Sequence, residues 1–143
     1  MEWRREGYRI STDPHELDRG LVHEFLRESY WASGIPREVV DRSIQNSLPF
    51  GVYAAGAMVG FARVITDFAT FAYVADVFVL PSHRGRGLAV WLMEVIRGHP
   101  GLQGLRRWVL ATRDAHALYR KTGFIELADP GRYMEIVDRD VYR

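Results

Sequence analysis

One short stretch of the chain combines positive charge with backbone freedom in a way that suits an anion. It reads His83-Arg84-Gly85-Arg86-Gly87-Leu88-Ala89. Glycines allow a tight turn and a close approach of backbone N–H groups to a ligand. Arginines add forked donors that match phosphate oxygens. The stretch is therefore a candidate cradle for a diphosphate, although a bare Gly-x-Gly alone would equally suit a solvated basic turn.

The elements on either side of this turn strengthen that interpretation. Residues 74–80 form a run of β-branched and aromatic residues that only Asp76 interrupts and that Pro81 ends, which predicts a buried strand. After the turn, apolar residues recur at helical spacing as far as Ile96, and Gly98 and Pro100 supply the stop. A helix that begins directly after the glycines points its positive dipole end and its unpaired N–H groups at the same place.

Two other phosphate-binding patterns do not fit the spacing. A dinucleotide-binding fingerprint needs a third small residue where Val90 stands, and an acidic residue about 20 positions later. A Walker-type loop needs Gly-Lys-Ser/Thr after four spacer residues, and the chain contains no such run.

A second pattern lies about 30 residues further on. Residues 115–124 read Ala-His-Ala-Leu-Tyr-Arg-Lys-Thr-Gly-Phe, with Tyr119 inside a predicted helix that ends at Gly123. Together with Arg-x-x-Gly-x-Ala at residues 84–89 and the preceding Val-x-Pro, this pattern resembles the GNAT family of N-acetyltransferases. The resemblance covers most of the chain and is strongest from about Gly51 to Phe124.

The resemblance implies an acetyl-CoA site. The cofactor diphosphate would bind at residues 84–89, and the acyl and pantetheine arm would lie along Val77, Phe78 and Val79. Thr112 stands where the family often has an asparagine that contacts the cofactor. Tyr119 would lie near the thioester sulfur and donate to the departing thiolate.

This chemistry also calls for a base if the amine arrives protonated. Asp76 is the only carboxylate inside the central strand, and strict alternation would give it a face shared with Val74 and Phe78. A carboxylate at such a position acts as a base, belongs to a water relay, or serves as a structural hydrogen-bond acceptor. The sequence leaves these three roles open.

The acceptor side is less defined. Tyr30 and Trp31 lie where the family places its acceptor-binding wall and are candidates to line a pocket for an amine-bearing substrate. As aromatic residues they would equally suit a core or an interface. The five histidines show no metal-ligand spacing, so no metal is assigned.

The order of predicted elements indicates one mixed α/β (α+β) domain over residues 1–143. The family resemblance implies a mostly antiparallel central sheet with helices on both faces. Residues 1–7 are expected to form a flexible polar tail. Strands are predicted over residues 8–11, 50–54, 58–65, 74–80, 108–111, 124–127 and 133–137, and helices over residues 17–31, 36–45, 88–96 and 115–121.

Composition limits the remaining classes. The net charge of +1 gives no general case for nucleic acid or a membrane surface, and neither is expected as a partner. The absence of cysteine excludes a thiol nucleophile and fits a reducing compartment. The first residues lack an apolar core of signal-peptide length, so a cytoplasmic location is expected.

The sequence thus predicts an acetyltransferase that moves acetyl from acetyl-CoA to a primary amine by direct attack in a ternary complex. The acceptor would be a small molecule or a peptide, and a homodimer is possible. The competing hypothesis is a non-catalytic acyl-CoA-binding module whose acceptor site has decayed.

Overall fold

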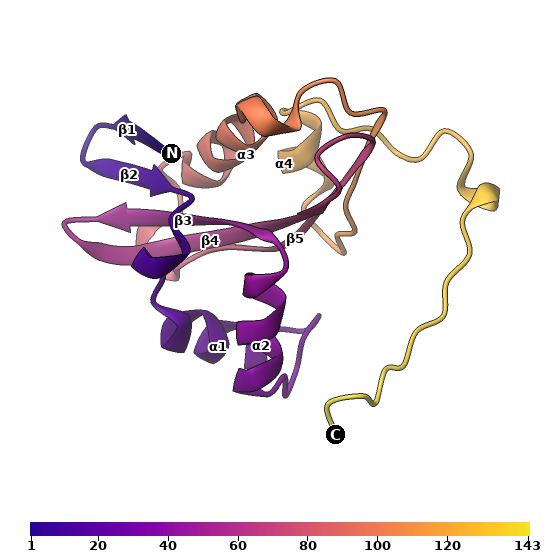
Figure 1. The fold of residues 1–143 in the computed structure, drawn as a ribbon, viewed down its shortest axis with the longest axis horizontal. Coiled ribbons are helices and arrows are strands. Elements are labelled where there is room, and N and C mark those ends of the chain that lie inside the picture. The colour runs from indigo at the N-terminus through magenta and orange to yellow at the C-terminus, as the bar shows by residue number, and fades with distance from the viewer.

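The computed structural model describes residues 1–143, which build a six-stranded sheet in the order β1-β2-β3-β4-β5-β6 (Figure 1). Neighbouring strands are antiparallel from β1 to β5, whereas β6 runs parallel to β5. The strands are β1 Glu2–Arg5, β2 Tyr8–Ser11, β3 Leu48–Ala54, β4 Ala57–Thr66, β5 Phe71–Val79 and β6 Arg107–Val109. The mixed, mostly antiparallel sheet expected from the sequence is confirmed.

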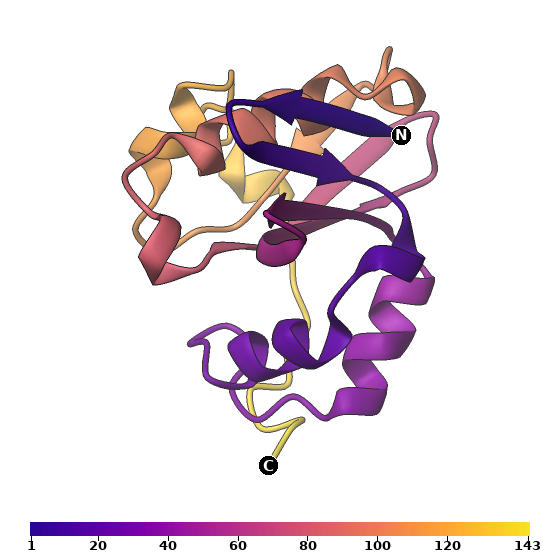
Figure 2. The ribbon, with the colours of Figure 1, turned by 90° about the vertical axis from the view of Figure 1, so that its left-hand side faces the viewer.

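Helices cover both faces of this sheet, as predicted. The helices are α1 Arg19–Arg27, α2 Arg37–Gln45, α3 Leu88–Gly98 and α4 His116–Arg120. Figure 1 shows α1 and α2 on one side of the sheet and α3 and α4 on the other, and Figure 2 shows the same separation from the side of the β1–β2 hairpin. The α1 helix begins later than the predicted residue 17, because Asp18 caps its start by accepting from the Leu21 N–H, and it ends at Arg27 rather than at residue 31.

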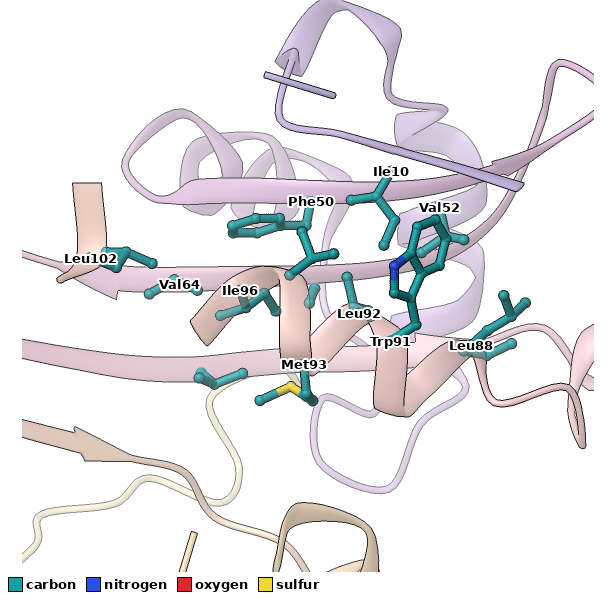
Figure 3. Close-up of a cluster of buried hydrophobic side chains, with 14 of the residues drawn as sticks. Ile10, Phe50, Val52, Val64, Leu88, Trp91, Leu92, Met93, Ile96 and Leu102 are labelled. Carbon is teal, nitrogen blue, oxygen red and sulfur yellow. The ribbon is translucent and has the colours of Figure 1, made fainter. Parts of the chain in front are cut away.

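The core consists of two apolar clusters, one on each face. The larger cluster packs α3 against β2–β5, with Leu92, Met93 and Ile96 fully buried (Figure 3). The smaller cluster joins α1 and α2 to the other face through Val22, Leu26 and other side chains. The sheet is therefore buried on both sides at β4 and β5, which agrees with their nearly continuous apolar sequences.

A bulge breaks the alternation of the central strand. The pairing of β4 with β5 shifts between Phe61 and Arg63, and Asp76 has a φ of +56°. Val74 consequently packs in the α3 cluster, whereas Phe78 packs in the α1–α2 cluster on the opposite face. The prediction that Asp76 shares one face with both of these residues is wrong, because an extra residue reverses the side-chain period.

The expected flexible tail at residues 1–7 is also wrong, since this segment contains β1. It pairs with β2 in register from Glu2–Ser11 to Arg5–Tyr8. Trp3 packs its ring near Phe50 at 6.3 Å between centroids, and the Arg5 guanidinium lies 5.9 Å from the Trp91 ring. A polar edge strand has little apolar signal in the sequence, because backbone pairing and a few aromatic contacts hold it.

The strands predicted at residues 124–127 and 133–137 do not form. These residues belong to what we call the C-terminal arm, residues 124–143. Phe124 and Tyr142 near its two ends pack against the core clusters, and the part between them runs apart from the body in an extended path with one 3₁₀ turn at Pro130–Arg132 (Figure 1). Met134 and Ile136 in the arm are essentially fully exposed. Their alternating apolar pattern is that of a strand, but the chain offers them no neighbouring strand to pair with.

None of the helices has the length and apolarity that crossing a bilayer requires.

Candidate active site

The glycine turn forms as predicted at the start of α3. Gly85 and Gly87 have φ angles of +78° and +74°, a region that residues with a Cβ rarely adopt. Gly87 is the N-cap of α3 and provides no side chain to bond the first N–H groups of the helix. A Cβ built on either glycine meets no atom within 4 Å. Conformation, rather than crowding within the chain, therefore requires glycine here, and the surface above the turn is open.

The two arginines of the turn are held by different parts of the sheet. Arg84 Nε donates to the Val79 carbonyl at the end of β5 at 3.0 Å. Arg86 donates to the Tyr8 hydroxyl at 2.8 Å, and that hydroxyl lies 3.0 Å from His83 Nδ1. Tyr8 lies on β2, far away in the sequence, so its part in the turn could not be predicted from spacing. The link restrains the turn before any ligand arrives.

Leu88 and Ala89 begin α3 directly after the turn. The Leu88 side chain is buried in the larger core cluster and Ala89 packs against it. Their side chains anchor the first turn of the helix, whose first backbone N–H groups have no partner within the helix.

A cleft of about 720 Å³ opens where β5 and β6 diverge. It brings together residues from the loop between α1 and α2, from β4 and β5, from the segment between β6 and α4, from α4 and from the C-terminal arm. The predicted site residues that line it are Tyr30, Trp31, Asp76, Val77, Thr112 and Tyr119. The sequence did not indicate the other lining residues, among them Arg63, Tyr73, Arg113 and Tyr142. Arg63 and Tyr73 lie within ordinary strands and Tyr142 within the arm, so only the fold places them here.

Asp76 is firmly held within this cleft. Its Oδ1 accepts from Trp31 Nε1 at 2.8 Å, and its Oδ2 accepts from Arg63 Nε at 2.6 Å. The Asp76 and Arg63 side chains are only 9% and 17% exposed. Both carboxylate oxygens thus have a donor, which offsets the cost of placing the charge there. The positive φ of Asp76 is the kind of local strain that clusters at functional sites.

Aromatic rings form one wall of the cleft. Tyr30 and Trp31 meet edge to face with ring centroids 5.1 Å apart. The Arg113 guanidinium lies 3.8 Å from the centre of the Tyr30 ring, and the Arg113 N–H donates to the Tyr30 hydroxyl at 3.3 Å. Tyr30 and Trp31 are 50% and 42% exposed, so they line a surface rather than a core.

Thr112 and Tyr119 also line the cleft. The Thr112 hydroxyl accepts from the Ala115 N–H at 3.0 Å, which shapes the turn into α4. Tyr119 is half-buried against Phe124, with ring centroids 6.1 Å apart. Burial, and to a lesser degree the nearby Tyr30, raises the pKa of Tyr119 to about 12. The phenol consequently stays protonated and able to donate throughout the physiological range.

Phe78 and Val79 are placed differently from the other predicted cofactor residues. Phe78 is buried, with its ring stacked on Phe25 at 4.0 Å, and Val79 is buried in the larger core cluster. Neither side chain lines the cleft, so these two positions could contact a ligand only through their backbone. Val77 does line the cleft and lies between the bulge and the end of β5.

No group of three or more histidine, aspartate or glutamate side chains is arranged to hold a metal ion.

Comparison with known proteins agrees with this arrangement. Residues 45–126 match the family model of the acetyltransferase (GNAT) domain, which is more than half of the chain. The chain belongs to the GNAT family. A Gibberella zeae protein designated an acetyltransferase is 31% identical over 85% of this chain and 80% of its own length.

Solved structures show the same GNAT fold. A Xanthomonas campestris pv. campestris protein assigned to the GNAT family is 48% identical, with a TM-score of 0.93 over 97% of this chain and 99% of its own. Because the similarity covers 97% of this chain, it includes most of the C-terminal arm. A Clostridium acetobutylicum protein described as an acetyltransferase and solved with acetyl-CoA shares the fold at 16% identity, with a TM-score of 0.66 over 96% of each chain.

Proposed function

We propose that this GNAT-family protein transfers the acetyl group of acetyl-CoA to a primary amine, by direct attack of the amine in a ternary complex. The observation that carries the proposal is the continuity of the two half-sites along β5. The strand passes from the cleft at Asp76 and Val77 to the glycine turn that begins at Arg84. A donor molecule bound at the turn can thus extend its acyl end along the strand into the cleft.

The turn provides what a diphosphate needs. Gly85 and Gly87 bring the backbone of the first turn of α3 to an open surface, and an 11-residue helix follows. Arg84 and Arg86 supply positive charge at the same point. Their bonds to Val79 and Tyr8 already fix the guanidinium groups, which lowers the ordering cost of binding.

The bulge in β5 supplies a backbone hydrogen-bond donor for the carbonyl oxygen of the acyl group. An extra residue in one strand leaves backbone groups without a ladder partner. In β5 this occurs beside Asp76 and Val77, at the wall of the cleft. An unpaired N–H in this position suits the oxyanion that forms when an amine attacks a thioester carbonyl.

Tyr119 acts on the leaving group in this proposal. An ordinary thiol has a pKa of about 8.5, well below the pKa of about 12 of Tyr119. The phenol is therefore too weak an acid to transfer its proton fully to the departing thiolate. It stabilises the negative sulfur as a hydrogen-bond donor, and no hydrogen bond within the chain contributes to its pKa or competes for it.

Asp76 is assigned a positioning role. Its two oxygens fix the Trp31 indole and the Arg63 guanidinium on the acceptor side of the cleft. The amine then loses its proton to solvent through a water relay. The acceptor itself is a small-molecule or peptide amine that binds between the Tyr30–Trp31 wall and β5. A cytoplasmic location is part of the proposal, supported by the cysteine-free chain.

Calorimetric titration with acetyl-CoA tests the proposal, followed by a screen of amines for CoA release. The wild type should bind acetyl-CoA, and the Arg84→Ala/Arg86→Ala variant should bind it at least about 10-fold more weakly, since each lost charged contact is worth roughly 1.5–3 kcal/mol. A matched control is Arg4→Ala/Arg42→Ala, which removes two exposed arginines outside the turn. If the folded wild type binds no acetyl-CoA, or the control loses as much affinity as the turn variant, the proposal fails.

A further inference from the structure

The cleft contains a guanidinium group with unused hydrogen-bond donors. Arg63 lines the cleft, and its side chain is only 17% exposed. Its Nε donates to Asp76 Oδ2 at 2.6 Å, and the Arg63 side chain makes no other hydrogen bond within the chain. A guanidinium has five N–H donors, so four of them are left without a partner in the protein.

These free donors restrict which molecules the cleft can accept. Most of the side chains that line the cleft are apolar or aromatic, among them Trp31, Tyr73 and Val77. A substrate that fills the cleft displaces the water to which the Arg63 N–H groups would otherwise donate, and unsatisfied buried donors are costly. A well-bound substrate must therefore bring oxygen acceptors to Arg63, and an analogue without them is rejected.

The charges around Arg63 favour a carboxylate over a phosphate. A planar carboxylate matches the fork of a guanidinium with two parallel hydrogen bonds. Asp76, which is only 9% exposed, already neutralises Arg63. A phosphate would bring a charge of about −1.5 to −2 to this place without a second buried cation. The other arginine of the cleft, Arg113, is 64% exposed and lies 3.8 Å from Asp114.

The same ion pair also suits an ammonium group beside the carboxylate. Each Asp76 oxygen accepts one hydrogen bond, from Trp31 or from Arg63, and a carboxylate can accept about four in all. Asp76 can thus attract a cationic amine while Arg63 binds an anion next to it. An α-amino acid carries these two groups on one carbon atom, with charges that the Arg63–Asp76 pair complements.

The pair lies at the point of β5 where the acyl group is expected. The register of the two strands pairs Arg63 with Ala75, and the next two residues, Asp76 and Val77, lie within the bulge. An amine that binds beside Asp76 is consequently next to the backbone that we assign to the acyl carbonyl.

We propose that the acceptor is an α-amino acid with an apolar or aromatic side chain, and that Arg63 determines this specificity by binding the carboxylate. The inference rests on the acetyl transfer proposed above. The side chain of the amino acid lies against Tyr30, Trp31 and Tyr73. When the nitrogen attacks, the N–C bond forms and the thioester C–S bond breaks. Of the two protons that the ammonium group loses, one ends on the CoA thiol and one in solvent, and the products are an N-acetyl amino acid and CoA.

Substrate analogues test this inference on the unaltered protein. L-Phenylalanine or L-leucine should be acetylated, and L-phenylalanine should have a kcat/KM roughly 10- to 150-fold above that of 2-phenylethylamine, which lacks the carboxylate. L-Phenylalaninamide, which lacks the charge, should be as poor as 2-phenylethylamine. The amide has the less basic amine, so more of it is in the attacking form at neutral pH, and amine basicity cannot produce the expected preference. A kcat/KM for either analogue equal to that of L-phenylalanine would overturn the inference.

Three variants test whether the preference depends on Arg63. Arg63→Met/Asp76→Asn removes both charges together, so no unpaired charge is buried, and asparagine tolerates the positive φ at position 76. The preference for L-phenylalanine over 2-phenylethylamine should disappear in this variant and persist in the matched control Asp76→Asn, which keeps Arg63. If the preference persists in the double variant, or is lost in Arg113→Gln instead, Arg63 does not bind the carboxylate.

Equilibrium binding separates this inference from the proposed reaction. Calorimetric titration of L-phenylalanine into the protein, alone and with CoA present, requires no acetyl transfer. If L-phenylalanine binds and Arg63→Met/Asp76→Asn loses that binding, the carboxylate site is supported even where no amine is acetylated, and only the proposed function fails. If other amines release CoA from acetyl-CoA but L-phenylalanine and L-leucine neither bind nor react, the proposed function stands and this inference fails.

Discussion

Replacement of one glycine separates the strain of the turn from its role in binding. We predict that Gly87→Ala weakens acetyl-CoA binding beyond its effect on stability. Gly87 has a φ of +74°, and a left-handed conformation costs a residue with a Cβ about 1–2 kcal/mol. For a domain of this size the loss lowers Tm by roughly 3–8 °C.

A second glycine provides a matched control. Gly104 lies in the loop before β6, away from the turn, with a φ of +77°, and a Cβ built there also meets nothing within 4 Å. Gly104→Ala should therefore lower Tm by about as much as Gly87→Ala, because the backbone cost is the same. The two variants should differ only in ligand binding.

The difference in affinity follows from the open surface above Gly87. A new methyl group there occupies the place where a diphosphate would approach the first N–H groups of α3. The loss of one or two hydrogen bonds to a charged group, about 1.5–3 kcal/mol, corresponds to roughly 10- to 150-fold weaker binding. Calorimetry with acetyl-CoA at a temperature well below Tm measures it. Wild-type affinity in Gly87→Ala, or an equal loss in Gly104→Ala, would refute the assignment of the turn.

Three further substitutions test other parts of the structure. Tyr119→Phe should lower the rate of acetyl transfer to an accepted amine about 100-fold without changing acetyl-CoA affinity. In the wild type, ionisation of this phenol should not lower the rate until the pH approaches 12. An unchanged rate in Tyr119→Phe would show that Tyr119 takes no part in the reaction. Asp76→Asn keeps a residue that tolerates positive φ but removes the charge opposite Arg63, so we expect a stability loss of about 1–3 kcal/mol and a higher KM for the amine. The pH–rate profile should keep its shape, whereas loss of its acidic limb would indicate that Asp76 is the base after all. Tyr53→Phe removes a buried hydroxyl that has no hydrogen-bond partner in the protein, so Tm should stay the same or rise by a few degrees, and a clear fall would show that the hydroxyl is satisfied.

The same tyrosines determine how stability responds to alkali. Burial is the main cause that raises the pKa values of Tyr53 and Tyr119 to about 12 from the ordinary value of about 10. The folded state therefore binds more protons than the unfolded state between pH 10 and pH 12. Stability contributed by these phenols is complete below pH 10 and decreases as pH rises through that window. In Tyr53→Phe the decrease measured by denaturant titration should be smaller.

Much of the candidate active site was predictable because its components are local in the chain. The turn at residues 84–89 needs only its glycines and the helix that follows, and both were evident from residue type and spacing. The central hairpin around Ala55-Gly56 and the helix with Tyr119 formed near their predicted bounds for the same reason. Within such segments, periodicity and turn chemistry decide the structure.

Other features depended on partners distant in the sequence. The bulge at Asp76 arises from the register that β4 imposes on β5, and that register reversed the expected face of Phe78. Arg63 and Tyr142 reach the cleft only because strand pairing and the path of the arm place them there. The charged segment Glu2–Arg5 forms β1 because its backbone pairs with β2 and Trp3 packs near Phe50.

The C-terminal arm illustrates which features the sequence alone determines and which depend on tertiary contacts. By itself the sequence determined the family, the glycine turn, the phenol of Tyr119 and the strand-like alternation of residues 133–137, since each is a property of neighbouring residues. Only the tertiary structure decided whether residues 133–137 pair with another strand. A strand is stabilised by the neighbouring strand that accepts its hydrogen bonds and packs against its apolar side chains. In the folded chain no strand pairs with this segment, which stays extended and largely exposed.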